Sequence, residues 1–306
     1  MGEFLKRNIS TIFVMLGNGC NLNCRYCLQH PLVEQSLSGR VNPDIYRFLE
    51  QIVEENDEKT TLGLHFYGGE PLIYFPLMKE MIEKTKHLKR VQYSTISNGK
   101  AITQEMVDLF NKIQLHVAIS WDGKNVLETR GYDVFAPGSK TRDLLLQLDH
   151  LCVSAVISAY NYPQEACDAF QDLSKDYFDI HGYPLSFNYD TIMDTGLGDK
   201  SLLDMDYDRV EREVGDMMDR YMKYRLNKGE MKFAELAFIE SRFNSLYDYN
   251  RKDGKFWNRQ WCCCNNGYSV LNLDLAGNLY PCHNTSRKAG SIYDPYFKYL
   301  NEVLKT

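Results

Sequence analysis

The stretch GNGCNLNCRYCLQH, residues 17–30, carries three cysteines, Cys20, Cys24 and Cys27, in the spacing C-x3-C-x2-C. Cysteine makes up roughly 3 % of the chain, so this spacing would arise by chance in about one of a hundred such chains. Three thiolates suit an iron–sulfur cluster, because soft ligands select such metals. A four-iron cluster with three cysteine ligands leaves one iron open to a reacting molecule. A zinc site with His30 as the fourth ligand is the alternative.

These cysteines directly follow a strand-like segment, and strand-like and helix-like segments then alternate. We expect strands at 11–16, 62–67, 91–97, 115–120, 152–158 and 185–190, and helices near 43–55, 75–87, 103–112, 140–149 and 163–175. Asn42 is expected to cap the first helix, with Pro43 at its first position. Six βα repeats predict an α/β fold, in which right-handed crossovers curl a parallel sheet into an open or closed barrel. The cysteines then lie at the carboxyl end of the first strand, where such folds place their sites.

Two later regions depart from this alternation. Residues 206–247 hold two long amphipathic helical patterns, and we interpret their stripe of Met217, Met218, Tyr221 and Met222 as core packing. Residues 268–273 and 278–282 predict a hairpin around a turn at 276–278.

The bulk composition narrows the class of protein. A hydrophobic fraction of 44 % and a charged fraction of 25 % are ordinary for a soluble globular chain of 306 residues. The net charge of −6 argues against nucleic-acid or membrane partners held by bulk electrostatics, although it is compatible with a basic peptide. The sequence shows neither a secretory signal nor an apolar stretch of about 18 residues, so we expect a cytoplasmic protein. In a reducing compartment, an odd number of cysteines indicates metal binding or catalysis rather than disulfides.

The three-cysteine motif, with the aromatic Tyr26 before its last cysteine, resembles that of the radical SAM superfamily. The resemblance implies that Cys20, Cys24 and Cys27 hold a [4Fe–4S] cluster and that Tyr26 belongs to the cofactor site. The amino and carboxylate groups of S-adenosylmethionine (SAM) would chelate the open iron. Electron transfer into the sulfonium would then yield a 5′-deoxyadenosyl radical that abstracts hydrogen. The missing fourth ligand is therefore interpreted as the cosubstrate.

The stretch FYGGEP, residues 66–71, ends the second predicted strand. Two glycines permit close backbone approach to a ligand, and Glu70 can accept a bond from a cation. The stretch matches the GGEP motif of the same family at Gly68, Gly69, Glu70 and Pro71. That match implies contact with the methionyl amino group of SAM, whereas a simple glycine turn before a helix is the alternative.

Polar residues also end the next three predicted strands, in ISNG (96–99), ISWDG (119–123) and ISAYN (157–161). These elements resemble those of the peptide-modifying branch of the family, with Ser97 in place of the usual threonine. The resemblance implies that Ser97, Asn98 and Asn161 contact SAM, and that Ser120 and Arg130 hold its carboxylate. Arginine suits bidentate carboxylate binding, although a surface ion is the alternative for Arg130.

A second cysteine cluster lies in WCCCNNGYSVLNLDLAGNLYPCH, residues 261–283. The spacing C-x12-G-x4-C, from Cys264 through Gly277 to Cys282, resembles the opening of a SPASM domain and implies an auxiliary iron–sulfur cluster. No cysteine follows Cys282, so the shorter twitch-type arrangement with one auxiliary cluster is the better analogy. Cys264 and Cys282 are the predicted ligands, with Cys262 and Cys263 as further candidates. The alternative is a zinc knuckle of Cys262, Cys264, Cys282 and His283.

The resemblance thus implies a partial (β/α)6 barrel with a short cysteine-rich hairpin domain at its carboxyl end. The expected boundaries are 1–195 for the barrel, 196–254 for a helical bridge and 255–306 for the auxiliary domain. No general base is selected by the sequence, and Asp122, Asp190 and Tyr189 are weak candidates because they lie near expected strand ends. Asp122 could equally be a turn former.

The predicted function is modification of a peptide or protein, as in the maturation of a ribosomally made peptide by a crosslink or thioether. Formylglycine formation, as in sulfatase maturases, is the nearest alternative, and chemistry on a small molecule is the third. A non-catalytic electron-transfer protein and a zinc-stabilised binding module are the rivals from other classes. The enzyme would need an external flavodoxin- or ferredoxin-type electron donor. Only ten residues precede the first strand, so a leader peptide would bind the barrel, the tail or a separate recognition protein.

Overall fold

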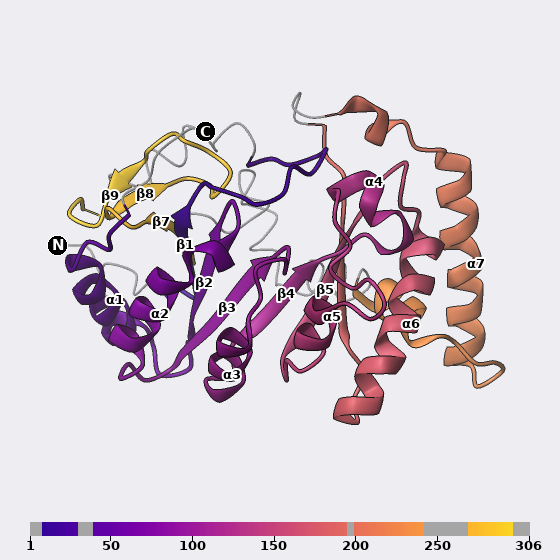
Figure 1. Cartoon of the computed structure of the whole chain (residues 1–306), viewed down its shortest axis with the longest axis horizontal. Helices are drawn as coiled ribbons and strands as arrows, with labels where there is room; N and C mark the ends of the chain where they lie inside the picture. Colours follow the sequence, from indigo (N-terminus) through magenta and orange to yellow (C-terminus); the bar gives the residue numbers. More distant parts are fainter. Residues whose placement is uncertain (1–7, 30–38, 195–198, 242–268, 296–306) are drawn as a thin grey trace.

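A computed structural model describes residues 8–29, 39–194, 199–241 and 269–295 (Figure 1). His30, Cys262, Cys263 and Cys264 lie outside the described residues, so both zinc alternatives and three of the auxiliary ligands remain predictions. The described strands form one sheet in the order β6-β5-β4-β3-β2-β1-β7-β8-β9.

The first six strands are parallel to one another and follow the predicted positions closely. They are β1 (Thr11–Gly17), β2 (Leu62–Gly68), β3 (Val91–Ser97), β4 (His116–Ser120), β5 (Leu151–Ile157) and β6 (Ser186–Thr191). The alternation of β2 shows why: Leu62, Leu64 and Phe66 are fully buried, whereas the residues between them are only half-buried. One face of the sheet is thus apolar and packs against helices.

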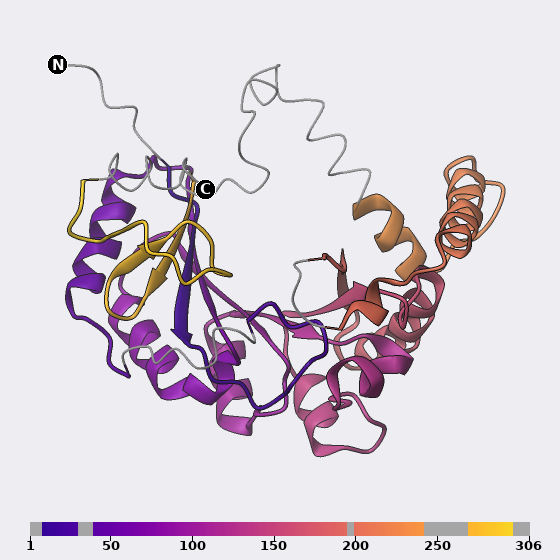
Figure 2. The same ribbon diagram turned by 90° about the horizontal axis from the view of Figure 1, so that it is seen from above.

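The helices that connect these strands lie on the outer, convex side of a curved sheet (Figure 2). They are α1 (Asp44–Glu55), α2 (Phe75–Thr85), α3 (Gln104–Lys112), α4 (Val126–Arg130), α5 (Lys140–Leu145) and α6 (Pro163–His181). The sequence patterns did not predict α4, which is too short to show a helical period, and α6 continues past the predicted end at 175. The α/β fold with a parallel, partly closed sheet is confirmed.

The predicted hairpin is present as β7 (Val270–Asp274) and β8 (Asn278–Tyr280), followed by the short β9 (Gly290–Ser291). Its attachment was not predicted: β7 pairs in parallel with β1, so the hairpin extends the barrel sheet. Asn42 reinforces this attachment. Its Oδ1 accepts a hydrogen bond from the Asp44 amide at the start of α1, and its Nδ2 donates to the Ala276 carbonyl in the hairpin turn.

Beyond β6 the chain forms the short 3-10 helix η4 (Lys200–Leu203), then α7 (Tyr207–Arg225) and a further helical segment at 233–241. Met217 is fully buried and Met218 packs against the core, which confirms the packing interpretation for them. It is wrong for Met222, which is 51 % exposed. None of the described helices combines the length and hydrophobicity that a bilayer crossing requires.

Candidate active site

The cysteine loop, residues 18–29, leaves the carboxyl end of β1 at Gly17. Cys20, Cys24 and Cys27 are all free and half-buried there. Burial is the main cause that raises the pKa of Cys20 and of Cys24, the latter to about 11, and Cys27 nearby raises both further. Each of these two thiols therefore lies within electrostatic range of Cys27. The Arg130 guanidinium acts in the opposite direction on the pKa of Cys24, because a cation favours the thiolate.

The two glycines of the GGEP motif pack against this loop. The Gly69 amide donates to the Gly17 carbonyl and the Glu70 amide to the Gly19 carbonyl, both at 2.9 Å. A Cβ on Gly69 would lie 2.3 Å from the carbonyl oxygens of Asn18 and Gly19, and one on Gly68 would lie 2.1 Å from that of Gly17. The close approach that these glycines allow in this structure is therefore to the chain's own loop.

Replacement of Gly69 by alanine should lower the free energy of unfolding by about 2 kcal/mol, because rigid backbone carbonyls must shift to admit the methyl group. Urea unfolding of the cofactor-free protein would measure this loss. Gly39→Ala is the matched control, since a Cβ there meets nothing within 4 Å. Equal unfolding free energies for the two variants would contradict the packing role of Gly69.

Tyr74, at the end of the 3-10 helix η2 (Pro71–Tyr74), is a site residue that the sequence patterns missed. Its hydroxyl oxygen accepts a 2.8 Å hydrogen bond from the Gly19 amide. Its ring occupies the space where a side chain at Gly17 would project. A single tyrosine after a GGEP stretch carries no signal by itself, because only the folded loop brings Gly17 and Gly19 to it.

Glu70 connects the ends of β2 and β3. Only 1 % of the residue is exposed, and its Oε1 accepts hydrogen bonds from the Ser97 hydroxyl (2.6 Å) and the Leu72 amide (2.9 Å). Its Oε2 accepts from the Asn98 amide at 2.8 Å. Burial raises the pKa of Glu70, while these three donors act in the opposite direction. The structure thus brings Glu70, Ser97 and Asn98 together, while their predicted contact with SAM stays a prediction.

Asn98 links this cluster to the cysteine loop. Its Nδ2 donates to Asn21 Oδ1 at 2.8 Å and lies 3.8 Å from the sulfur of Cys20. Its own Oδ1 accepts from the Lys100 amide, which fixes the side chain. The carboxyl ends of β1, β2 and β3 therefore meet at the first cysteine.

Asp122 is the centre of a second buried cluster, on the other side of the cysteine loop. It is fully buried, and its carboxylate accepts two hydrogen bonds from Arg130, through Nε at 2.9 Å and Nη2 at 3.2 Å. It also accepts from the hydroxyls of Tyr26 and Thr129 and from the Val156 amide. A carboxylate with five donors has its acceptor capacity filled, so this arrangement suits a positioning residue better than a general base.

Arg130 is buried rather than a surface ion: its side chain is 9 % exposed. Its guanidinium carbon lies 5.2 Å from the centre of the Tyr26 ring, and the charge acts on Cys24. Asp122 accepts hydrogen bonds from Nε and Nη2 of Arg130, and no acceptor for Nη1 is found among the described residues. The arginine is thus held rigidly beside the cysteine loop with donors available to an anionic ligand.

The remaining predicted residues have no contact with the cysteine loop among the hydrogen bonds of the described residues. Ser120 is half-buried at the end of β4. Asn161 is buried, and its Nδ2 donates to the Val156 carbonyl at the end of β5. Tyr189 donates to the Phe238 carbonyl at 3.2 Å and stacks on the Phe238 ring, which holds it against the helical segment 233–241. Asp190 is exposed.

The segment after β8 approaches the same loop. Gln29 donates through Nε2 to the His283 carbonyl at 3.0 Å and to Asn284. The Tyr67 hydroxyl donates to Asn284 Oδ1 at 3.4 Å, and burial raises the pKa of Tyr67, with Cys27 and Cys282 as further causes. His283 stacks on Phe13, and burial lowers its pKa to about 4. Cys282 therefore lies within electrostatic range of the same tyrosine as Cys27.

The donor set can be tested against the predicted cluster. Among the described residues, no three His, Cys, Asp or Glu side chains converge on a point where one metal ion would sit. A four-iron cluster requires less convergence, since each thiolate binds its own iron. The cysteine loop holds three free thiols, and close contacts with glycines keep it at the carboxyl ends of the strands. With the buried Arg130 beside one thiol, this arrangement fits such a cluster and a cosubstrate that carries a carboxylate.

Comparison with known proteins leads to the same family. Residues 14–125 match the radical SAM superfamily. The chain is 22 % identical over 320 aligned positions to the radical SAM cyclopropyl synthase TigE of Paramaledivibacter caminithermalis, which covers 94 % of this chain and 60 % of TigE. It is 25 % identical over 167 positions to a cysteine-type anaerobic sulfatase-maturating enzyme of Clostridium perfringens, covering 47 % of this chain and 44 % of that enzyme.

The fold also agrees with a solved structure, that of native anSMEcpe with bound AdoMet and the Cp18Cys peptide. The TM-score is 0.69 at 16 % identity, over 96 % of this chain and 81 % of that one. The alignments span 60 % of the length of TigE and 44 % of that of the maturating enzyme, so the chain matches only part of each relative. Residues 14–125 therefore match a radical SAM domain, and the chain is similar in sequence to a radical SAM cyclopropyl synthase and to a sulfatase-maturating enzyme.

Proposed function

We propose that this protein cleaves SAM reductively and removes hydrogen from a peptide or protein substrate. The observation that carries the proposal is the meeting of three free thiols, the buried carboxylate of Glu70 and the buried Arg130 at one edge of the sheet. A [4Fe–4S] cluster with SAM on its open iron would supply the electron transfer and the 5′-deoxyadenosyl radical. The protein supplies the ligands, the orientation of SAM and exclusion of water.

The residues divide these tasks. Cys20, Cys24 and Cys27 are the proposed cluster ligands. The Glu70 carboxylate, held by donors from β3, can accept hydrogen bonds from the amino group of SAM. Arg130 can donate Nη1 to its carboxylate, because Asp122 fixes the other side of the guanidinium. Burial of both groups strengthens these interactions, since little water competes with them.

An auxiliary cluster is proposed at the open end of the hairpin. Cys282 follows β8 and lies within electrostatic range of Tyr67, as does Cys27. Cys264 is the proposed partner of Cys282, with Cys262 and Cys263 as further candidates, and all three precede β7 in the chain. Such a cluster would accept an electron from the substrate or bind it.

The substrate class is proposed from the related proteins. The sulfatase-maturating enzyme acts by name on a protein, and the solved structure holds a peptide together with AdoMet. The alignment with TigE, by name a cyclopropyl synthase, spans nearly the whole chain and favours bond formation. We propose that the bond forms within a ribosomally made peptide. Formylglycine formation is the second candidate, because the maturating enzyme aligns with about half of the chain. An external one-electron donor completes the proposed system.

Anaerobic reconstitution with iron and sulfide, followed by SAM and dithionite, tests the proposal. Each short peptide encoded beside the gene for this chain would be supplied fully deuterated. We expect one peptide to transfer deuterium into 5′-deoxyadenosine and to lose two hydrogen isotopes on forming a crosslink. Mass spectrometry of both products measures this, and fragmentation of the peptide separates a crosslink, which joins two residues, from formylglycine, which changes one residue.

The possible contrary results are distinct. Formation of 5′-deoxyadenosine without deuterium from any peptide would contradict a peptide substrate and favour a small molecule. No 5′-deoxyadenosine, with iron and sulfide content confirmed, would contradict the enzyme assignment and favour an electron-transfer role.

A further inference from the structure

An apolar groove of about 370 Å³ lies beside the carboxyl ends of β5 and β6. Apolar residues of α7 form one wall, and the helical segment 233–241 contributes Phe238 and Ile239. The floor comes from the two strands, with Ile157 of β5 and Tyr189 of β6. The groove is large enough for a few apolar side chains, and no described strand pairs with the outer edge of β6 beside it.

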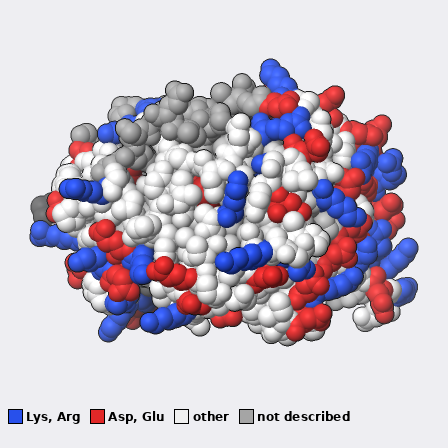
Figure 3. Space-filling view, in the orientation of Figure 1, with Lys and Arg blue, Asp and Glu red and all other residues white. Residues whose placement is uncertain are grey.

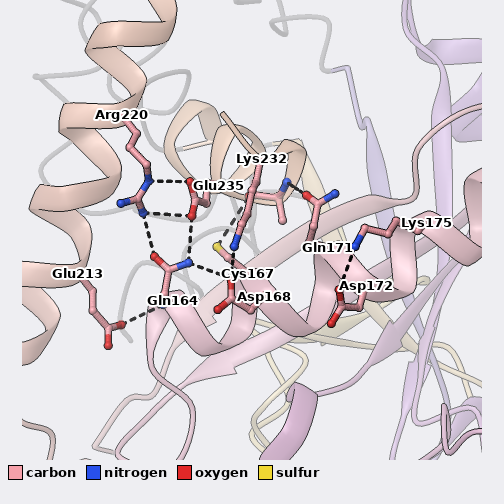
Figure 4. Close-up of polar contacts among 11 residues, drawn as sticks. Gln164, Cys167, Asp168, Gln171, Asp172, Lys175, Glu213, Arg220, Lys232 and Glu235 are labelled. Atoms are coloured by element: carbon pink, nitrogen blue, oxygen red, sulfur yellow. Dashed lines mark hydrogen bonds and ion pairs between the residues drawn. The ribbon is translucent and has the colours of Figure 1, made fainter. Parts of the chain in front are cut away.

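The walls of the groove are held by polar contacts between α6, α7 and residues 232–235 (Figure 4). Arg220 of α7 donates to both carboxylate oxygens of Glu235, at 2.9 and 3.1 Å, and to Gln164 of α6. Lys232 pairs with Asp168 of α6 at 2.8 Å. These charges are paired with one another, so they stabilise the walls. Of the apolar side chains between them, Val214 and Met218 are half-buried, whereas Phe238 is buried.

Acidic residues outnumber basic ones beside the groove-lining residues in the sequence, although Arg212 of α7 is also exposed. Charged side chains are frequent over α6 and α7 (Figure 3). Those next in sequence to the lining residues are acidic with one exception, Arg209, which Glu165 and Glu213 already neutralise. The exposed acidic ones are Asp190, Asp204, Asp206, Asp208, Glu211 and Asp219. A ligand that fits this rim carries positive charge around its apolar part.

The groove is also connected to the cysteine loop. Arg25, between Cys24 and Tyr26, pairs with Asp199 and donates to Ser201, and the Asp199 amide donates back to the Arg25 carbonyl. Asp199 precedes η4, which leads directly to the groove residues Met205 and Tyr207. A chain held in the groove therefore lies next to the segment that contacts the candidate active site.

We propose that this groove, lined by Val214, Met218 and Phe238 and rimmed by aspartates, binds a recognition segment of the peptide substrate in which apolar residues are flanked by lysine or arginine. The segment lies extended along β6, so that alternate side chains enter the groove while basic residues face the rim. The inference rests on the proposed peptide substrate and adds where the peptide is held, outside the catalytic centre.

Fluorescence anisotropy with labelled synthetic peptides of eleven residues tests this. The probes are a peptide with Phe and Leu separated by one residue and flanked by lysines, the same peptide with glutamates for the lysines, and one with serines for Phe and Leu. We expect the basic apolar peptide to bind the full chain at least ten times more tightly than either of the others. Its affinity should fall with added salt, because the rim charges are exposed.

Two sets of variants locate the binding. Met218→Ser should weaken binding of the basic apolar peptide about fivefold. Met222→Ser, one turn further along the same helix, exposed and outside the groove lining, should not change it. Asp204→Lys combined with Asp208→Lys should weaken it at least tenfold. Glu54→Lys with Glu58→Lys carries the same change in net charge on exposed positions far away in the sequence and should have little effect.

Equal binding of the basic and acidic peptides, or no effect of the rim variant, would overturn the proposal. If Met218→Ser fails to fold, the rim variant decides, because its residues are exposed. SAM cleavage measured without peptide separates the two proposals. If SAM is cleaved but no peptide binds at the groove, the groove proposal alone is refuted. If SAM is not cleaved, the proposed function is refuted.

Discussion

Cys24→Ala should abolish the formation of 5′-deoxyadenosine from SAM and lower the iron bound at the cysteine loop. Arg130, Cys20 and Cys27 are all electrostatic neighbours of Cys24. Two remaining thiols cannot hold the proposed four-iron cluster in its site, so we expect at least a hundredfold loss of activity. Anaerobic reconstitution followed by iron, sulfide and 5′-deoxyadenosine assays measures both effects.

Cys152→Ala is the matched control for this variant. Cys152 is a half-buried free cysteine in β5, outside the cysteine loop, and burial alone raises its pKa, to about 11. This variant should keep its iron and its activity. If Cys24→Ala retained wild-type iron and formed 5′-deoxyadenosine, the cysteine loop would not be the cluster site.

The second large effect is expected at Asp122, where Asp122→Asn should lower the free energy of unfolding by about 3–5 kcal/mol. The substitution removes the negative charge that neutralises the buried Arg130 guanidinium. The NH2 group of the new asparagine would also face an N–H or O–H donor of Arg130, Thr129 or Val156, so a hydrogen bond is lost. Urea unfolding of the cofactor-free protein measures the loss. SAM affinity should fall as well, because the orientation of Arg130 depends on this carboxylate.

Asp199→Asn provides the comparison. Asp199 pairs with Arg25 at 2.6 Å, but its side chain is 41 % exposed, so water competes with the pair and the loss should stay below about 1 kcal/mol. An equal loss of unfolding free energy in both variants would show that the buried cluster around Asp122 contributes no more to stability than an exposed ion pair. Rescue of SAM affinity without rescue of stability in a second-site variant would separate the positioning role from the structural one.

Much of the fold was predictable because its signals are local. Strands β1 to β6 alternate or run apolar over five to seven residues, and the helices between them repeat at helical spacing, so short windows of sequence were enough. The cysteine spacing and the GGEP stretch were likewise readable as motifs. α4 was missed because five residues show no period.

The cluster around Asp122 could not be predicted in the same way. Asp122 lies 34 positions from Val156 and 96 from Tyr26, so nothing in its neighbourhood distinguishes it from a turn former. The contact of Tyr74 with Gly19 and the acidic rim of the groove were unpredictable for the same reason. Each requires segments that are distant in the sequence to be brought together by the curved sheet.

By itself the sequence determined the order of strands and helices, the three-cysteine loop and the position of each polar residue at a strand end, because periodicity and spacing are properties of neighbouring residues. Only the tertiary structure decided that β7 joins β1, that Glu70 binds the end of β3 and that Asp122 holds Arg130 beside Cys24. Those contacts depend on which strands lie next to each other. That choice is made by burial of the whole sheet against its helices, which no short segment encodes.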